Sequence, residues 1–544
     1  MKRNKILCLV ALLLALTLLC GCTLPAEVEE MLLALDEYIN QQNSVKFSQL
    51  TYVRPDSKAF VELKDNAVSV VERTEKADDI VSQFWILYDA YDLYYTMLSL
   101  ADIHYCQNVA DSYWKAEYAA CMEGSVEVDA AMEEFYYAAA HSDLVDELED
   151  DQYFGPGFFD GYRGESVWDQ PFLELNNREA ELLNRYYELA EGSGNLNRSY
   201  DALAEVYVEL VKVRKQIAAR LGFDSYAEYA YLSQFSRDYT PEDMEHYYGQ
   251  IARVLSPIYA AVDDSGFWSR GLSYCDEEEA LEYLSGTASN MGGRILSAFD
   301  FMNEYELFDI SYGRNKFDSS FELYLYSYEM PFLFTCPYGE ADDALVFAHE
   351  FGHFCNDYAT SGYSAGTDVA EVFSQGMEYL TLCYAEGVWD EDRIDELTRW
   401  KMVDCLCTYV EQACYACFEQ RVYALPEDRL TPENVRALYE QTAREFRTDY
   451  PGWDSRYYVT VTHFYAYPFY IPSYVVSNDV AFQIYQMELD DPGSGLKAYT
   501  DVLESDESYL LDFAEEMGLE SPVAEDRVYS VAQTMEQILG DLIG

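Results

Sequence analysis

Apolar residues recur at helical spacing over most of the chain. They repeat every three or four positions from about residue 32 to 149, and residues 203–221 form a strongly periodic stretch that Gly222 ends. Residues 240–243 combine a hydroxyl N-cap, a proline and a carboxylate, which is typical of a helix start. Residues 390–543 are again helical in pattern, except for 450–474. The pattern predicts a mainly α fold.

The helical pattern is interrupted at two places, which indicate a small sheet and a domain boundary. Residues 321–326 alternate with period two and residues 331–336 form a second extended run, which predicts a small antiparallel sheet. A strand edge there could hold a peptide main chain by backbone hydrogen bonds, although a simple packing hairpin is the alternative. Glycine and serine at 192–195 mark a break. We therefore expect an N-terminal tether and helical region at 23–195 and a catalytic domain at 196–544.

A His-Glu-x-x-His motif at residues 349–353 follows the predicted sheet. On a helix, His349 and His353 lie on one face one turn apart, where two imidazole nitrogens can bind one Zn²⁺. Glu350 lies about 100° round the same helix, close enough to take a proton from a water at the metal. The spacing predicts a hydrolytic zinc site.

The third ligand is expected from a second helix. Glu371 lies 18 residues after His353 in an apolar repeat, and the intervening residues 360–367 contain two glycines and two serines, as a turn would. Glu378 follows two turns later on the same face, where it could orient a ligating histidine. The predicted ligand set for a single Zn²⁺ is His349, His353 and Glu371.

The composition favours a globular protein and limits the classes of partner that it can bind. The chain has 544 residues, 50% of them hydrophobic and 16% aromatic, so a large core is expected. It carries 99 acidic residues against 35 Lys plus Arg, a formal charge of −64. Such a field repels nucleic acid and attracts cationic ligands, so nucleic-acid binding is excluded and cationic peptides are favoured.

The first 22 residues resemble a bacterial lipoprotein signal peptide. A basic start at Lys2, Arg3 and Lys5 precedes 14 apolar residues and the sequence Leu19-Cys20-Gly21-Cys22. Fourteen apolar residues are few for a membrane span. We expect cleavage before Cys22, lipidation of its sulfur and an extracytoplasmic, membrane-anchored protein. Ordinary secretion is the alternative.

The other ten cysteines are scattered and show no disulfide framework. Four of them lie at 405, 407, 414 and 417, within a continuous helical pattern over 400–423 that offers no turn to fold them round an ion. Cys355 falls on the opposite side of the metal helix from the histidines. We expect buried thiols at these positions, with the disulfide state left open.

One more histidine stands in a run of phenols near the end of the chain. His463 precedes Tyr465, Tyr467, Tyr470 and Tyr474 within twelve residues. A zinc peptidase needs donors aimed at the oxyanion of its tetrahedral intermediate, and histidine or tyrosine can supply one. His463 is therefore a candidate catalytic residue.

Taken together, these motifs resemble the thimet oligopeptidase and oligoendopeptidase F family of zinc peptidases. The resemblance covers about residue 200 to the C-terminus and includes residues 210–223, Asp342-Asp343, the zinc motifs and Pro468-Phe469-Tyr470. Asn356, Ser319-Ser320 and Pro472 depart from the family pattern without removing a ligand or the base. The resemblance implies an elongated helical body with a deep substrate channel and zinc at its floor.

By the same resemblance, His349, His353 and Glu371 would bind the metal and Glu350 would act as base. His463, with Tyr470 and Tyr474, would stabilise the oxyanion or position substrate, and the choice among the tyrosines stays open because Pro472 interrupts their series. The implied function is a zinc metalloendopeptidase that cleaves internal bonds of short oligopeptides. Two alternatives remain: a zinc carboxydipeptidase of similar fold, and a lipoprotein that binds peptides without cleaving them.

Overall fold

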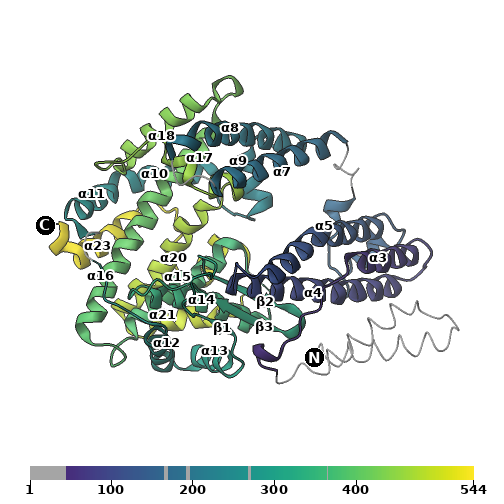
Figure 1. Ribbon diagram of the computed structural model, residues 1–544, viewed down its shortest axis with the longest axis horizontal. Coiled ribbons are helices and arrows are strands. Elements are labelled where there is room, and N and C mark those ends of the chain that lie inside the picture. Colours follow the sequence, from purple (N-terminus) through teal and green to yellow (C-terminus); the bar gives the residue numbers. More distant parts are fainter. Residues whose placement is uncertain are drawn as a thin grey trace.

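The computed structural model describes residues 45–163, 170–191, 196–267, 271–363, 365–505 and 507–543. Within them the chain is mainly helical and has one three-stranded sheet (Figure 1). The predicted signal peptide with Cys22, the start of the tether and the break at 192–195 lie outside the described residues. No helix in the described ranges combines the length and apolarity that crossing a bilayer requires.

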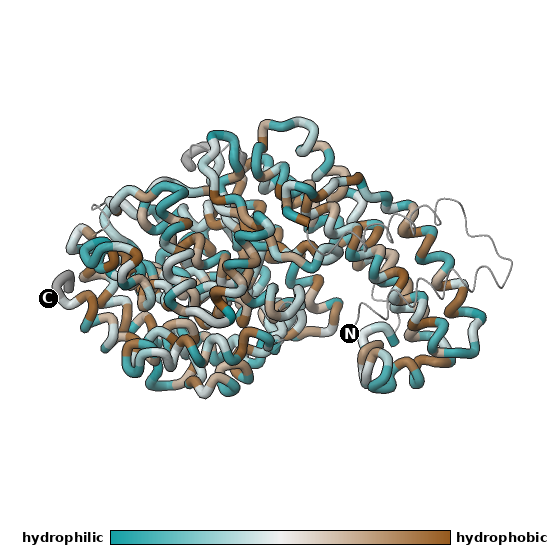
Figure 2. The backbone as a smooth tube through the Cα atoms, turned by 90° about the horizontal axis from the view of Figure 1, so that it is seen from below, coloured by the Kyte–Doolittle hydropathy of each residue, from teal (hydrophilic) through white to brown (hydrophobic). Residues whose placement is uncertain are grey.

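The N-terminal helices form a group with a core of their own. These are α3 (Ser57–Val71), α4 (Ala77–Gln107), α5 (Ser112–Ala140) and α6 (Val145–Leu148), at the right of Figure 1. Apolar and polar residues are interleaved along them (Figure 2), and Phe60, Leu87 and Phe135 lie in their shared core. α4 also contacts β2 and the turn that follows it, where Thr96 Oγ1 accepts a hydrogen bond of 2.9 Å from the amide of Ser327. The helical prediction for this region is confirmed over its described part.

A second layer of helices lies across the top of the molecule in Figure 1. It contains α7 (Gln170–Glu191), α8 (Leu196–Arg220), α9 (Tyr226–Tyr229), α10 (Pro241–Val254), α17 (Ala413–Ala424) and α18 (Pro432–Phe446). α10 begins as predicted, since the Thr240 hydroxyl and the Asp243 carboxylate each accept the other's backbone N–H. α8 ends before Gly222, whose φ of +91° suits glycine.

The sheet has the order β1-β3-β2. β2 (Phe321–Leu325) and β3 (Met330–Phe334) are antiparallel, with Phe321 opposite Phe334, which confirms the predicted pair. β1 (Phe308–Asp309) adds a short parallel strand that sequence reasoning missed, because two residues carry no readable period. β3 is buried throughout and paired on both sides, so a peptide could add only at an outer edge of the sheet.

Three helices frame the region of the His-Glu-x-x-His motif. α14 (Asp343–Thr360) packs against β2 and β3 on one side and α15 (Thr367–Cys383) on the other, and α15 in turn packs on α20 (Ile471–Asp490). The carboxylate of Asp343 accepts the backbone N–H groups of residues 338–340, as suits the first turn of a helix. At Gly352 the backbones nearly touch: an added Cβ would lie 2.4 Å from the Phe373 carbonyl oxygen.

The remaining helices complete the body. They are α11 (Ser256–Asp264), α12 (Glu277–Met291), α13 (Gly293–Glu304), α16 (Glu391–Cys407), α19 (His463–Ala466), α21 (Ser494–Asp501), α22 (Leu510–Glu516) and α23 (Arg527–Ile543). α16 continues into α17 through a π-helical turn, Thr408–Gln412, so the helix predicted over 400–423 is confirmed. All ten cysteines in the described ranges are free.

The prediction of an irregular segment at 450–474 is partly wrong. α19 forms one helical turn at His463, and α20 begins at Ile471 rather than after Tyr474. Pro472 lies in the first turn of α20, where the missing N–H costs no helical hydrogen bond. Proline at this position therefore starts a helix that carries Tyr474.

Candidate metal centre

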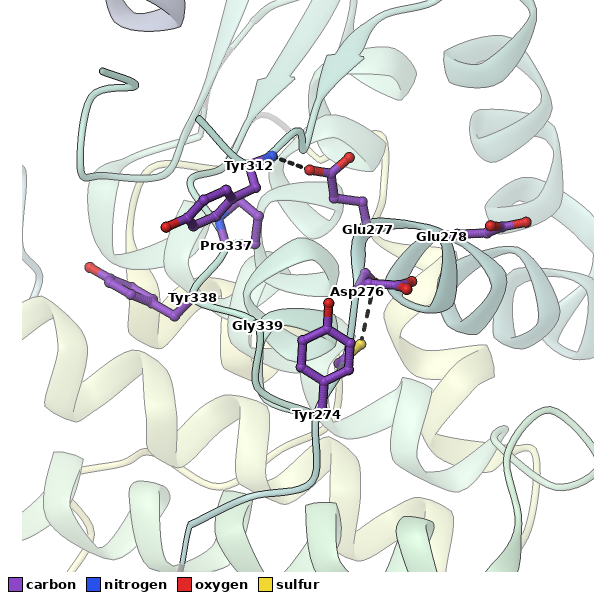
Figure 3. A pocket seen from close by; sticks show the side chains of 9 residues that line it. Tyr274, Asp276, Glu277, Glu278, Tyr312, Pro337, Tyr338 and Gly339 are labelled. Carbon is purple, nitrogen blue, oxygen red and sulfur yellow. Dashed lines mark hydrogen bonds between the residues drawn. The ribbon is translucent and has the colours of Figure 1, made fainter. Parts of the chain in front are cut away.

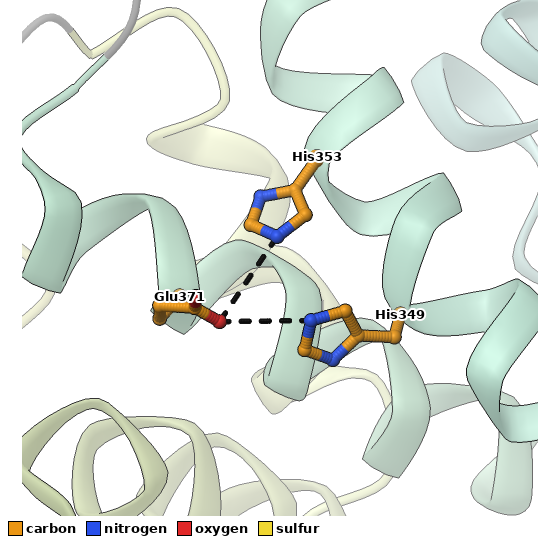
Figure 4. A group of neighbouring side chains, drawn as sticks. All are labelled: His349, His353 and Glu371. Carbon is orange, nitrogen blue, oxygen red and sulfur yellow. Dashed lines mark ion pairs between the residues drawn. The ribbon is translucent and has the colours of Figure 1, made fainter. Parts of the chain in front are cut away.

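The three predicted ligands converge in space. Glu371 Oε2 lies 3.6 Å from His349 Nε2 and 4.0 Å from His353 Nε2 (Figure 4). One ligand atom from each residue falls within 4.8 Å of the others, and this is the one such group of histidine, cysteine and acidic residues found in the described ranges. Tetrahedral zinc ligands at about 2.1 Å from the ion stand roughly 3.4 Å from one another. Two imidazoles and a carboxylate at these separations fit a single divalent ion.

Both helices hold these ligands for clear local reasons. The i, i+4 spacing places the imidazoles on one face of α14, and Gly352 lets that helix approach α15 closely enough for Glu371 to reach them. The imidazole side chains remain 25% and 21% exposed, whereas that of Glu371 is 9% exposed. The centre is therefore open to solvent on the histidine side.

A chain of buried charges orients His349. Its Nδ1 lies 2.8 Å from Glu378 Oε1, and Glu378 Oε2 lies 2.6 Å from the Nζ of Lys401. An Nδ1–H donated to the carboxylate leaves the Nε2 lone pair facing Glu371 and His353. Burial alone would raise the pKa of Glu378, but Lys401 and His349 outweigh it, so its pKa is lowered and it stays a carboxylate.

Glu350 is buried beside the ligand group. Burial raises the pKa of its carboxyl to about 7; His349 opposes this shift, and the nearby carboxylates of Glu371 and Glu378 add to it. A carboxyl that titrates near neutral pH is suited to accept and return a proton. The structure thus places Glu350 beside the ligand group, and its role as base stays a prediction.

The phenol-rich segment faces the same point from α19 and α20. Tyr470 donates its hydroxyl to Glu371 Oε1 at 3.0 Å, and the Tyr474 hydroxyl lies 3.4 Å from His463 Nε2. The rings of Tyr470 and Tyr474 each lie 5.7 Å from that of His463. Tyr467 is 56% exposed and has a more peripheral place. The structure thus brings His463, Tyr470 and Tyr474 to the ligand group.

Burial also sets the protonation of these donors. It lowers the pKa of His463, so the imidazole is neutral near pH 7, and it raises the pKa of the Tyr470 and Tyr474 phenols. Neutral phenols remain hydrogen-bond donors over the whole physiological range. They can therefore stabilise negative charge that develops on an oxygen nearby.

One cavity lies away from the metal centre. It has a volume of about 500 Å³ and is lined by Tyr274, Tyr312 and Tyr338 together with acidic residues at the start of α12 (Figure 3). Glu277 accepts the backbone N–H of Tyr312 at its wall. None of the predicted site residues lines this cavity, so it is separate from the metal centre.

Comparison with known families agrees with the site. The model of the peptidase M3 N-terminal domain matches residues 47–163, and that of peptidase family M3 matches residues 318–525, together more than half of the chain. This chain belongs to peptidase family M3. It is a metallopeptidase, which confirms the predicted family and enzyme class. The alternative of a lipoprotein that binds peptides without cleaving them is therefore excluded. No curated protein matches the chain.

Solved structures share the fold of this M3 peptidase. PZ peptidase A, solved with an inhibitor, is 19% identical with a TM-score of 0.77, covering 91% of this chain and 99% of its own. A protein provisionally assigned as oligoendopeptidase F from Bacillus anthracis str. Ames is 20% identical with a TM-score of 0.75 and covers 92% and 99%. An M32 carboxypeptidase from Deinococcus radiodurans R1 is more distant, at 11% identity and a TM-score of 0.54 with 90% and 100% covered.

Sequence reasoning identified the three residues that converge but missed the residues that support them. Lys401, Arg214, Arg237 and Glu419 are all buried and all contact site segments, yet none was a candidate. Charged residues flank Lys401 on α16, so no signal in the sequence singled it out. The predicted domain division at 195/196 stays a prediction.

Proposed function

We propose that this M3 peptidase is a zinc-dependent endopeptidase of short oligopeptides. The observation that carries the proposal is the convergence of His349, His353 and Glu371 within 4.8 Å, with a buried glutamate beside them. Two imidazoles and one carboxylate are a common donor set for catalytic zinc, which keeps a fourth position for water or substrate. A closed structural site would use four protein ligands instead.

The residues divide the chemistry among them. When bound, Zn²⁺ would supply Lewis acidity, polarising the scissile carbonyl and making a water easier to deprotonate. Glu350 takes the proton from the attacking water and passes it to the leaving amine. His463 and the tyrosines donate hydrogen bonds to the oxygen that becomes negative. Glu378 keeps His349 in the tautomer that presents Nε2.

Charge supports cationic peptides as the preferred substrates. The formal charge of −64 produces a field that attracts positive chains over distances of about a Debye length. The short-peptide preference rests on the family resemblance, which implies a deep channel that would exclude folded proteins.

The test uses residues 23–544 and quenched-fluorescent peptides. We expect hydrolysis that a chelator abolishes and Zn²⁺ restores, and a loss of at least about 10³-fold in kcat for Glu350→Gln with Zn²⁺ binding retained. Cleavage that persists in both the chelated enzyme and the variant would refute the mechanism. Peptides with amidated C-termini separate the two activities, because a carboxydipeptidase would reject them and an endopeptidase would not.

We further propose that Cys22 is lipidated and anchors the enzyme outside the cytoplasm. The sequence Leu19-Cys20-Gly21-Cys22 after an apolar stretch supports this. Cells fed a labelled fatty acid should incorporate it into the protein and retain it in the membrane fraction. Cys22→Ser should abolish both, and a labelled Cys22→Ser protein would refute the assignment.

A further inference from the structure

Two buried arginines bind the main chain of residues 463–474, the segment that carries the candidate oxyanion donors. Arg214 comes from α8, and Arg237 comes from the residues between α9 and α10. Their side chains are 1% and 0% exposed, and neither contacts the metal ligands directly. Both direct their guanidinium groups at main-chain carbonyls of residues 463–474.

Arg237 joins three parts of the site. Its Nη2 donates to the Phe469 carbonyl at 2.9 Å and to Ser473 Oγ at 2.8 Å, and its Nε lies 3.3 Å from Asp368 Oδ2. Asp368 stands one turn before Glu371 on α15, while Phe469 immediately precedes Tyr470. One planar cation therefore fixes the helix of the third ligand relative to the turn that carries the tyrosine.

The conformation of Phe469 shows how firmly this turn is held. Its φ is +64°, a left-handed conformation that a bulky side chain rarely adopts, and the residue is buried. Its N–H donates to Glu419 Oε2 at 2.9 Å and its carbonyl accepts from Arg237. Strained residues of this kind persist where the surroundings determine them, and they are common at functional sites. The turn directs the Tyr470 hydroxyl to Glu371.

Arg214 does the same for the other end of the segment. Its Nη1 donates to the Phe464 carbonyl at 3.2 Å and its Nη2 to the Tyr465 carbonyl, directly after His463. Its Nε is paired with Glu179 on α7 at 2.6 Å, which compensates the charge. Arg214 thus fixes the main chain next to His463, in addition to the contact between the His463 side chain and Tyr474.

We propose that Arg214 and Arg237 are positioning residues that hold His463, Tyr470 and Tyr474 in the geometry needed to stabilise the transition state. The proposal rests on the proposed peptidase function, and it adds a second group of determinants that lies outside the metal site. Because oxyanion donors must be placed within a fraction of an ångström, loosening the segment lowers catalysis more than substrate binding.

The experiment compares Arg237→Lys and Arg214→Lys with Arg527→Lys as a matched control. Arg527 is also buried and pairs with Asp479 of α20 at 2.7 Å, but its contacts do not reach residues 463–474. For Arg237→Lys we expect kcat to fall by about 10²-fold while KM changes by less than about threefold, and affinity for a phosphinic analogue of the same peptide to fall in step with kcat. Arg214→Lys should change in the same direction.

Two further measurements distinguish positioning from general damage. Zn²⁺ affinity, from competition with a chelating dye, should stay within about threefold of the wild type. Hydrogen exchange over residues 463–474 should be faster in both variants and unchanged in Arg527→Lys. The exchange result tests the positioning role even if the wild type proves not to cleave peptides. Lack of cleavage by the wild type would refute the proposed function but not the positioning role. Unchanged exchange, or a loss of kcat that merely follows Zn²⁺ loss, would overturn the proposal.

Discussion

Lys401→Met tests the chain of charges behind His349. Lys401 is 3% exposed, and its Nζ lies 2.6 Å from Glu378 Oε2 and 2.9 Å from Asp404 Oδ2. Methionine keeps most of the volume and removes the charge. Glu378, whose pKa is now lowered, would then be a buried carboxylate without its cation, and its pKa would rise.

The expected magnitude follows from the burial of both partners. Removing one member of a buried ion pair costs about 3–5 kcal/mol, because the other charge is left uncompensated. A Glu378 that binds a proton avoids part of this cost but accepts less strongly from His349 Nδ1. Loss of such a support typically weakens metal binding by about 10–100-fold. We therefore expect a weaker Zn²⁺ complex together with a lower melting temperature.

Zn²⁺ competition with a chelating dye and thermal unfolding with and without Zn²⁺ measure the two effects. Asp404→Asn is the matched control, because it removes the more exposed partner of Lys401 and leaves the Glu378 pair intact; it should cost less than about 1 kcal/mol. If Lys401→Met binds Zn²⁺ within about twofold of the wild type, the charge chain does not orient His349 and the reasoning is wrong.

Three further outcomes are expected. In a thermal unfolding assay, Gly352→Ala should destabilise the protein by about 1–3 kcal/mol and weaken Zn²⁺ binding, because the new Cβ meets the backbone of α15. The control, Gly249→Ala on α10, places its Cβ near no other atom and should be neutral or stabilising in the same assay. Burial raises the pKa of Glu419 to about 8, so the folded state binds a proton that the unfolded state releases, and the free energy of unfolding should fall as pH rises from about 4.3 to 8. Glu419→Gln lacks this titration, so its melting temperature relative to the wild type should rise between pH 5 and 9. A constant difference would contradict this. For cationic peptides kcat/KM should fall as salt rises from about 50 to 500 mM, and for anionic peptides of the same length it should not.

The convergence of the predicted metal ligands could be inferred from sequence because their geometry is mostly local. His349 and His353 share one helix, so a period of 3.6 residues is enough to place them together. Glu371 needed one further step, a turn that folds α15 back onto α14, and the glycines and serines between the helices indicated it. The antiparallel strands were readable for the same reason, since their alternation is local as well.

The supporting residues could not be found in this way because their contacts cross the chain. Arg237 binds Phe469 from 232 positions away, and Lys215 of the same layer binds carbonyls more than 200 positions away. No period or motif encodes such a partner. The sequence also suggested that Pro472 disrupts the tyrosine series, whereas in the structure it starts α20, because a proline in the first helical turn lacks only an N–H that would have no intrahelical partner.

Three of the buried cations lie near the metal centre or behind residues 463–474. With 99 acidic and 35 basic residues, few cations are available, yet Lys401, Arg214 and Arg237 are buried around the metal centre. Lys401 compensates Glu378, which contacts His349, and Arg237 compensates Asp368 on the helix of Glu371, whereas Arg214 is itself compensated by Glu179. Glu350 and Glu371 have no such lysine or arginine partner among the ion pairs of the described residues. A divalent ion would supply their missing positive charge, so the same electrostatics that make the site costly without metal favour metal binding in the folded state.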